Sequence, residues 1–166
     1  MLSSLLGKVA KQKHKTHLKK GDAAPPISGK DQEGKDLTFD HFPGKKIVLF
    51  FYPQDGTLTC TKESCNLRDN YPLLRSKGYE VIGVSPDDET SHRKFSSKYK
   101  LPYLLIADTE RKIINAYGVW GKKTLFGRTY DGLLRTTFLI SEKRIIEKVI
   151  TEVDSGDHAE QIVTSK

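Results

Sequence analysis

Cysteine is scarce in this chain, which has only two in its 166 residues, Cys60 and Cys65. Two cysteines are too few for the disulfide framework of a secreted chain of this length, and too few by themselves for a structural zinc site. Redox-active thiols in a reducing compartment fit this composition better, so we expect a cytoplasmic protein.

Long hydrophobic runs are also absent. The longest, residues 47–52, has the length of a strand, whereas a membrane-spanning helix needs about 20 apolar residues. The apolar stretch at residues 2–6 is too short for the core of a secretory signal, and lysines follow it instead of preceding it. We therefore expect neither a membrane span nor a secretory signal.

Acidic residues are missing from the first 20 positions, which hold six lysines. The net charge of the whole chain is +7, so the remainder carries only +1 and the basicity belongs to a tail. This near-neutral body argues against nucleic-acid binding. We expect residues 1–20 to form a flexible basic tail and residues 21–164 to form one domain, since the chain is short for two cores.

The tail has two patterns of its own. Apolar residues at helical spacing within residues 2–9 suggest a short amphipathic helix, which could rest on an anionic surface, although frayed termini are commoner. His14 and His17 could take part in a metal site only with further ligands, so we expect residues 14–17 to be solvated.

From residue 21 onward, segments with strand patterns alternate with segments with helix patterns. β-Branched and aromatic residues predict strands at residues 36–39, 47–52, 79–85 and 103–107, and a hairpin formed by 136–140 and 144–149. Apolar residues at helical spacing predict helices at residues 60–77, 89–99, 111–117 and 157–163. This order predicts an α/β fold, a thioredoxin-like sandwich in which a mixed central β-sheet is flanked by helices on both faces.

Residues 53–65 carry the chemistry. A strand ends at Pro53, a tight loop follows, and Cys60 falls in the first turn of the next helix, with Thr59 as a plausible N-cap. The free backbone N–H groups and the helix dipole then face the sulfur and favour the thiolate, which is the nucleophilic form. Thr57 can hold its hydroxyl beside the sulfur. Free cysteines most often simply pack in a core, but this placement and the second cysteine favour a reactive role.

Cys65 follows Cys60 by five positions. In an ideal helix their Cα atoms would lie roughly 8.7 Å apart on different faces. This exceeds the roughly 7 Å limit for a disulfide, so the two could react together only if the helix unwinds locally. Such a pair suits a catalytic disulfide better than a structural one, and it lacks the C-x-x-C spacing of a dithiol reductase.

At these residues the chain resembles a known family. Pro53-x-x-x-Thr57-x-x-Cys60 is similar to the peroxiredoxin active-site motif, and Cys65 five residues later resembles the peroxiredoxin Q (bacterioferritin comigratory protein) branch. The resemblance covers residues 21–163. It includes the motifs Gly21-Asp22-x-Ala24-Pro25, Phe50-Phe51-Tyr52-Pro53, Leu67-Arg68-Asp69, Tyr117-Gly118-Val119-Trp120-Gly121, Tyr130-Asp131-Gly132 and Arg135-Thr136-Thr137-Phe138-Leu139-Ile140.

The resemblance implies a role for each motif residue. Cys60 becomes the peroxidatic cysteine, Thr57 its hydroxyl partner, Cys65 the resolving cysteine and Arg135 the guanidinium beside the sulfur. It also implies a thiol-dependent peroxidase that reduces hydrogen peroxide and organic hydroperoxides, is recycled by thioredoxin or a similar dithiol, and is monomeric. No metal, haem, flavin or other cofactor is implied.

This chain departs from the family pattern immediately before Cys60. Most members of the branch have Pro-Gly there, whereas this chain has Leu58-Thr59. Because proline and glycine would fix the backbone of that turn, the departure leaves the mobility of the loop open. Trp120, Phe126 and Tyr52 are candidates for apolar walls of the site, although aromatic residues more often form plain core.

Two other classes of function remain open from the sequence. A thioredoxin-like disulfide reductase would reduce protein disulfides without peroxide, but the C-x-x-C motif is missing. A non-enzymatic module tethered by its basic tail would show salt-sensitive binding that survives loss of both cysteines. Peroxide consumption with and without Cys60 separates the three.

Overall fold

The computed structural model describes residues 14–164. The strands are β1 (Ser28–Lys30), β2 (Asp36–Thr38), β3 (Lys46–Phe51), β4 (Tyr79–Ser85), β5 (Leu104–Ala107), β6 (Trp120–Leu125), β7 (Arg128–Leu133), β8 (Thr136–Ile140) and β9 (Ile146–Ile150). The helices are η1 (Phe39–His41), a short 3₁₀ turn, α2 (Leu58–Asp69), α3 (Tyr71–Ser76), α4 (Glu89–Tyr99), α5 (Lys112–Ala116) and α6 (His158–Val163).

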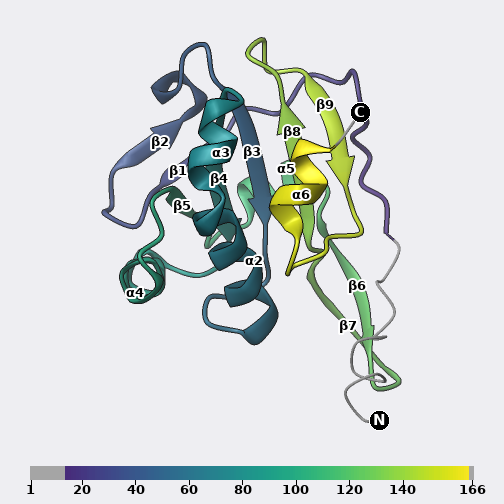
Figure 1. The fold of residues 1–166 in the computed structure, drawn as a ribbon. Helices are drawn as coiled ribbons and strands as arrows, with labels where there is room; N and C mark the ends of the chain where they lie inside the picture. The colour runs from purple at the N-terminus through teal and green to yellow at the C-terminus, as the bar shows by residue number, and fades with distance from the viewer. Residues whose placement is uncertain (1–13, 165–166) are drawn as a thin grey trace.

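Seven of the strands form one mixed sheet in the order β2-β1-β5-β4-β3-β8-β9 (Figure 1). The central strands β3, β4 and β5 are parallel, and the β3–β8 and β8–β9 pairs are antiparallel. The buried run of β3 explains its position, because a strand covered on both faces needs apolar side chains in both directions.

Helices cover both faces of this sheet. Leu49 and Phe51 of β3 point into one core, whereas Phe50 of β3 and Tyr52 directly after it point into the other. In Figure 1, α2, α3 and α6 lie on one face of the sheet and α5 lies on the other. Full burial of a large apolar side chain contributes about 1.5–3 kcal/mol, so these two cores hold the layers together. The predicted α/β thioredoxin-like sandwich is confirmed.

The predicted helix over residues 60–77 is wrong as a single element. The structure has two helices there, α2 and α3, with Asn70 as the residue between them. Pro72 lies in the first turn of α3, where its missing N–H costs nothing. In a continuous helix its ring would clash with the carbonyl of Arg68, so the chain breaks before it.

A separate two-stranded sheet, β6 and β7, was not predicted. It projects away from the main sheet in Figure 1, and it turns through Phe126 and Gly127, which have φ angles of 51° and 77°. Two successive positive φ angles match the twist of a tight hairpin. The Phe126 side chain is 89% exposed at this turn, so its expected role as an apolar wall of the site is wrong.

Residues 14–20 lie against the body of the protein, which contradicts the expectation that residues 14–17 are solvated. The hydroxyl of Thr16 donates to the carbonyl of Tyr117 at 2.5 Å, and His14 Nε2 lies 2.7 Å from the Thr136 hydroxyl. Leu18 packs on the core. The predicted amphipathic helix in residues 2–9 falls outside the described residues, and the domain boundary at residue 20 remains a prediction. No helix within residues 14–164 is long and apolar enough to cross a bilayer.

Candidate active site

The loop after β3 places Cys60 at the start of α2. Thr57 is the N-cap of this helix, with extended backbone angles, and its hydroxyl accepts a hydrogen bond from the Cys60 N–H at 3.4 Å. The expected cap, Thr59, instead lies inside the first turn. Cys60 is therefore the third residue of α2, where the dipole and unpaired N–H groups favour a negative charge.

The Leu58-Thr59 departure leaves this cap intact. Leu58 is the first residue of α2 and is 87% exposed. Proline is favoured at this position because the N–H there has no partner within the helix, and leucine can occupy it with the same backbone. The helix therefore starts directly after Thr57 without the usual proline.

Pairing of β8 with β3 brings Arg135 to the sulfur. The register joins Phe51 to Thr136, so Arg135, directly before β8, lies beside the end of β3. Its Nη2 donates to Cys60 Sγ at 3.1 Å, and its Nη1 donates to Glu63 Oε1 at 2.7 Å. Burial lowers the pKa of Arg135, but the charges of Glu63 and Cys60 outweigh it and raise the pKa above its usual value. The guanidinium is thus a fixed positive charge at the thiol.

Glu63 is a site residue that the sequence analysis missed. Its side chain is fully buried and binds Arg135, which is 17% exposed. Its second oxygen, Oε2, has no hydrogen-bond partner among the described residues and lies 3.7 Å from His158 Nε2. Glu63 follows Cys60 by three positions, a spacing that places two side chains on one face of a helix, and this spacing was the available signal.

His158 lies behind Glu63. Its Nδ1 is 2.8 Å from the Gln161 Oε1 oxygen, and its Nε2 is 2.8 Å from the Thr137 hydroxyl. Gln161 Oε1 also accepts the Asp154 N–H, which fixes the amide orientation, so His158 must donate through Nδ1. No sequence motif indicates a role for His158, because its contacts with Thr137 and Glu63 come from segments far away in the chain.

Lys123 of β6 adds a second cation near the sulfur. Its Nζ donates to the Leu133 carbonyl at 2.9 Å. Burial and then the neighbouring Arg135 lower the pKa of Lys123, whereas Cys60 raises it. Arg135 and Lys123 thus place two basic groups around Cys60, against the one carboxylate of Glu63.

Cys65 lies on the same helix as Cys60, as the predicted separation assumes. Both are free thiols, Cys60 buried and Cys65 partly buried. Burial raises the pKa of Cys65, and Asp69 adds to this effect, while Arg68 opposes it. Because a raised pKa disfavours the thiolate, Cys65 is a thiol at neutral pH and a poor nucleophile in this conformation.

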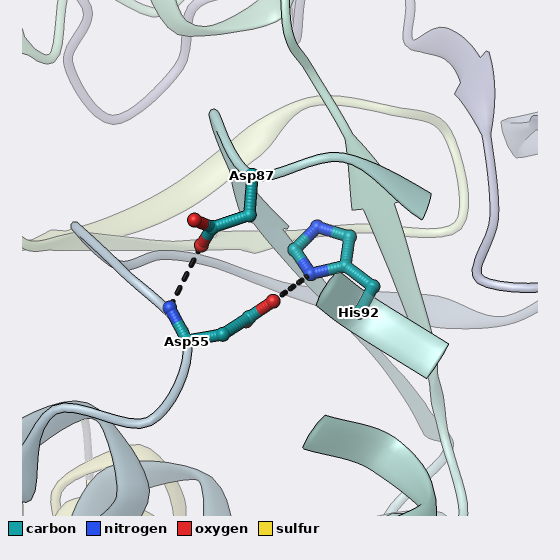
Figure 2. A group of neighbouring side chains, drawn as sticks. All are labelled: Asp55, Asp87 and His92. Carbon is teal, nitrogen blue, oxygen red and sulfur yellow. Dashed lines mark hydrogen bonds and ion pairs between the residues drawn. The ribbon is translucent and has the colours of Figure 1, made fainter. Parts of the chain in front are cut away.

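A second polar cluster includes Asp55, which lies in the loop between β3 and α2. Asp55, Asp87 and His92 place one ligand atom each within 4.8 Å of one another (Figure 2). Carboxylates and imidazole can bind a divalent cation. Both nitrogens of His92 already face oxygen atoms, Asp55 Oδ2 at 2.6 Å and the Ile106 carbonyl at 3.0 Å, so a cation would have to displace these bonds.

A protein-family model described as the AhpC/TSA family matches residues 20–149. The chain belongs to this family. The peroxiredoxin is 36% identical to Peroxiredoxin Bcp of Escherichia coli strain K12 over 146 residues, which cover 88% of this chain and 94% of that one. It is 40% identical to Peroxiredoxin Bcp of Bacillus subtilis strain 168 over 147 residues, with the same two coverages.

Solved structures agree with this assignment. The peroxiredoxin superposes on peroxidoxin BcpB of Mycobacterium tuberculosis with a TM-score of 0.79 and 29% identity, covering 89% of this chain and 96% of that one. It superposes on the bacterioferritin comigratory protein of Xanthomonas campestris with a TM-score of 0.77 and 27% identity, covering 84% and 88%. The predicted membership of the peroxiredoxin Q branch is confirmed, and with it the class of enzyme, a thiol-dependent peroxidase.

Proposed function

We propose that this peroxiredoxin reduces hydrogen peroxide and organic hydroperoxides with Cys60 as the peroxidatic cysteine and Cys65 as the resolving cysteine. The observation that carries the proposal is the contact between Arg135 and the Cys60 sulfur at the start of α2. The relative from Xanthomonas campestris has been studied for its alkyl peroxide reduction activity, which supports the same substrate class here.

In the first step the Cys60 thiolate attacks the terminal peroxide oxygen. A sulfur–oxygen bond forms, the oxygen–oxygen bond breaks, and sulfur loses two electrons to the peroxide. The leaving oxygen takes a proton and departs as water or an alcohol, and Cys60 becomes a sulfenic acid. The guanidinium of Arg135 can bind the peroxide and stabilise the charge that develops on the leaving oxygen.

In the second step Cys65 attacks the sulfenic acid sulfur. Water leaves and a disulfide joins Cys60 to Cys65, after which a dithiol, which we take to be thioredoxin, reduces it by exchange. Both cysteines lie on one continuous helix, so α2 must open between them first. Opening also removes the burial that raises the pKa of Cys65, and the thiolate becomes accessible.

The proposal also covers the role of Thr57, the oligomeric state and the cellular compartment. Thr57 holds the start of α2 through its bond to the Cys60 N–H, and its hydroxyl donates to the Gln54 carbonyl at 3.3 Å. We propose that the protein acts as a monomer in a reducing cytoplasm without binding nucleic acid. The two free cysteines support a reducing compartment. The near-neutral charge of residues 21–166 supports the absence of nucleic-acid binding.

A coupled assay with thioredoxin, its reductase and a series of peroxides tests the proposal. Wild type should consume hydrogen peroxide and organic hydroperoxides, and Cys60→Ser should lose all but a trace of turnover, since a serine hydroxyl without a base is a poor nucleophile. Undiminished turnover in Cys60→Ser would refute the assignment. Reduction of insulin disulfides by the wild type without peroxide would instead indicate a disulfide reductase.

A further inference from the structure

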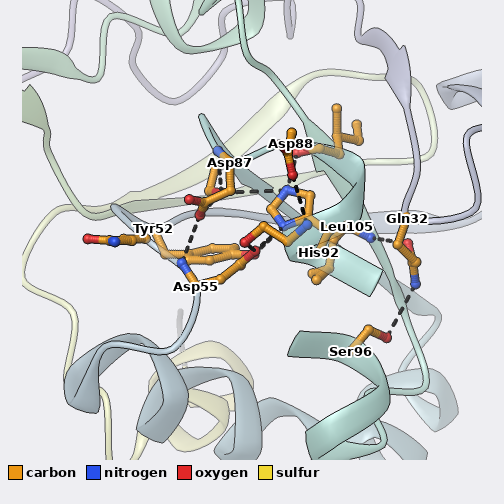
Figure 3. Close-up of polar contacts among 12 residues, drawn as sticks. Gln32, Tyr52, Asp55, Asp87, Asp88, His92, Ser96 and Leu105 are labelled. Atoms are coloured by element: carbon orange, nitrogen blue, oxygen red, sulfur yellow. Dashed lines mark hydrogen bonds and ion pairs between the residues drawn. The ribbon is translucent and has the colours of Figure 1, made fainter. Parts of the chain in front are cut away.

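Asp55, five residues before Cys60, is held at four points. Its backbone N–H donates to Asp87 Oδ2 at 2.7 Å, and its carboxylate accepts from the Tyr52 hydroxyl at 2.6 Å and the Ser91 hydroxyl at 2.8 Å. The fourth bond, to His92 Nδ1, is 2.6 Å long. Figure 3 shows Tyr52, Asp87 and His92 around Asp55; they come from the residue after β3, the segment after β4 and α4.

The contact between Asp55 and His92 is a short, buried hydrogen bond. The side chains are 5% and 0% exposed. His92 Nε2 faces the Ile106 carbonyl, which can only accept, so this nitrogen carries a hydrogen. Nδ1 faces a carboxylate oxygen that already accepts a hydroxyl, and a proton between them completes the bond. His92 therefore joins Asp55 to the Ile106 carbonyl through its two ring nitrogens, and both contacts are shielded from water. Hydrogen bonds in such a buried site hold their partners in fixed positions.

The residues immediately after Asp55 are exposed. Gly56 has a φ angle of +81°, a conformation that glycine adopts easily, and a Cβ added there would meet nothing within 4 Å. Residues 56–59 are all exposed, and Cys60 is buried again. Asp55, which is held by four bonds, is thus followed by Gly56, whose backbone can rotate easily, and then by the exposed first turn of α2.

We propose that Asp55 and His92 are a positioning pair for the peroxidatic cysteine. The pair fixes the end of the loop that carries Thr57 and Cys60 while α2 opens on its far side, with Gly56 as the hinge. This inference rests on the proposed function, because it assigns Asp55 and His92 a positioning role in the reaction of Cys60. Neither Asp55 nor His92 touches the sulfur; the pair acts through the placement of the helix start.

Hydrogen exchange on the wild type tests the position of the hinge. After one equivalent of peroxide, amides from residue 57 to the middle of α2 should exchange faster, because that segment has unwound. The Asp55 amide, bonded to Asp87, should keep its protection. Loss of protection at Asp55 in the disulfide form would overturn the proposal, whatever the turnover of the enzyme.

The two chemical steps provide the second test. In His92→Leu, the rate constant for peroxide attack should fall about tenfold or more, since small misplacements of a reacting group cost that much. Formation of the disulfide from the sulfenic acid should not slow, because that step requires an open α2. Attack is measured by competition with a haem peroxidase for hydrogen peroxide, and disulfide formation by rapid quenching and mass spectrometry.

Three variants separate positioning from lost stability. His92→Asn keeps a donor near the position of Nδ1 and should recover part of the attack rate. Ser91→Ala removes one bond from Asp55 and should show a smaller loss, which keeps the test available if His92→Leu does not fold. Ile146→Ala lowers stability from the buried core of β9 without touching Asp55, and should leave both rate constants unchanged below its unfolding temperature.

The results distinguish a failure of the positioning role from a failure of the proposed function. If attack in His92→Leu is as fast as in wild type, or if both steps slow equally, the positioning pair is wrong and the roles of Cys60 and Cys65 stand. If Cys60→Ser retains turnover, the proposed function fails on its own test.

Discussion

Nη2 of Arg135 lies 3.1 Å from Sγ of Cys60, although the two residues are 75 positions apart in the chain. The same guanidinium holds the buried Glu63, so its plane is fixed by two contacts at once. A planar cation held in this way can meet the thiolate and a peroxide oxygen together, whereas a mobile lysine would meet them in turn.

Arg135→Met should reduce the thiolate fraction of Cys60 at neutral pH and slow peroxide reduction by about tenfold or more, since a desolvated cation is removed while much of the side-chain volume remains. The pH dependence of thiol alkylation and the rate of peroxide consumption measure this. Arg128→Met is the matched control, because Arg128 is exposed on the hairpin. Equal alkylation profiles for Arg135→Met and wild type would contradict the assigned role.

Glu63→Gln should destabilise the protein by about 3 kcal/mol, because removing one partner of a buried ion pair leaves the other uncompensated. Peroxide attack should also slow, since Arg135 loses the bond that orients it. Urea unfolding measures the first effect and peroxide competition the second. Glu160→Gln on the exposed side of α6 provides a control that removes the same charge. An unchanged unfolding midpoint in Glu63→Gln would show that the pair contributes nothing net.

Cys65→Ser should let the Cys60 sulfenic acid persist, over-oxidise more readily and turn over more slowly with thioredoxin. One equivalent of peroxide should give an intramolecular disulfide in the wild type, with a loss of helical signal as α2 opens. Peptide mapping of the oxidised protein identifies the bridge. A map without a Cys60–Cys65 link would leave a peroxidase with a single working cysteine.

At alkaline pH the buried tyrosines should ionise only when the protein unfolds. Burial raises the pKa of Tyr52 and Tyr103 well above the usual value of 10.0, and Asp55 adds to this for Tyr52. Because the folded pKa is higher than the unfolded one, the stability that these groups contribute is complete below pH of about 10 and is lost as the pH rises further. Phenolate absorbance should therefore rise in one step with the loss of secondary structure. Early titration of Tyr52 or Tyr103 in the folded state would contradict this.

The sequence predicted the elements with strong periodic patterns. The strand at residues 79–85 and the helix at residues 89–99 coincide with β4 and α4. It missed β1, whose Gly29 gives no strand signal: a Cβ there would lie 2.6 Å from Ile106 Cγ2, so tertiary packing selects the glycine. It missed β6 and β7 because most of their residues are polar or exposed, so they lack the alternation of apolar side chains that marks a strand.

The candidate site was predictable where a motif fixes it and not where the fold assembles it. Cys60, Thr57, Cys65 and Arg135 all stand in recognisable motifs, and the structure brings Thr57 and Arg135 into contact with Cys60. His92 and Asp55, in contrast, meet only because α4 packs against the loop after β3. No local pattern encodes a contact between segments 37 residues apart.

The long sequence separation between Cys60 and Arg135 also determines at which stage of folding Cys60 becomes reactive. Arg135 reaches the sulfur only after β8 has paired with β3, a contact of high sequence separation that forms slowly because a long loop must close first. A partly synthesised chain that ends before β8 carries Cys60 without its cation. Until β8 has paired with β3, Cys60 should react with peroxide more slowly than in the finished enzyme, so a growing chain is less exposed to oxidation at this sulfur.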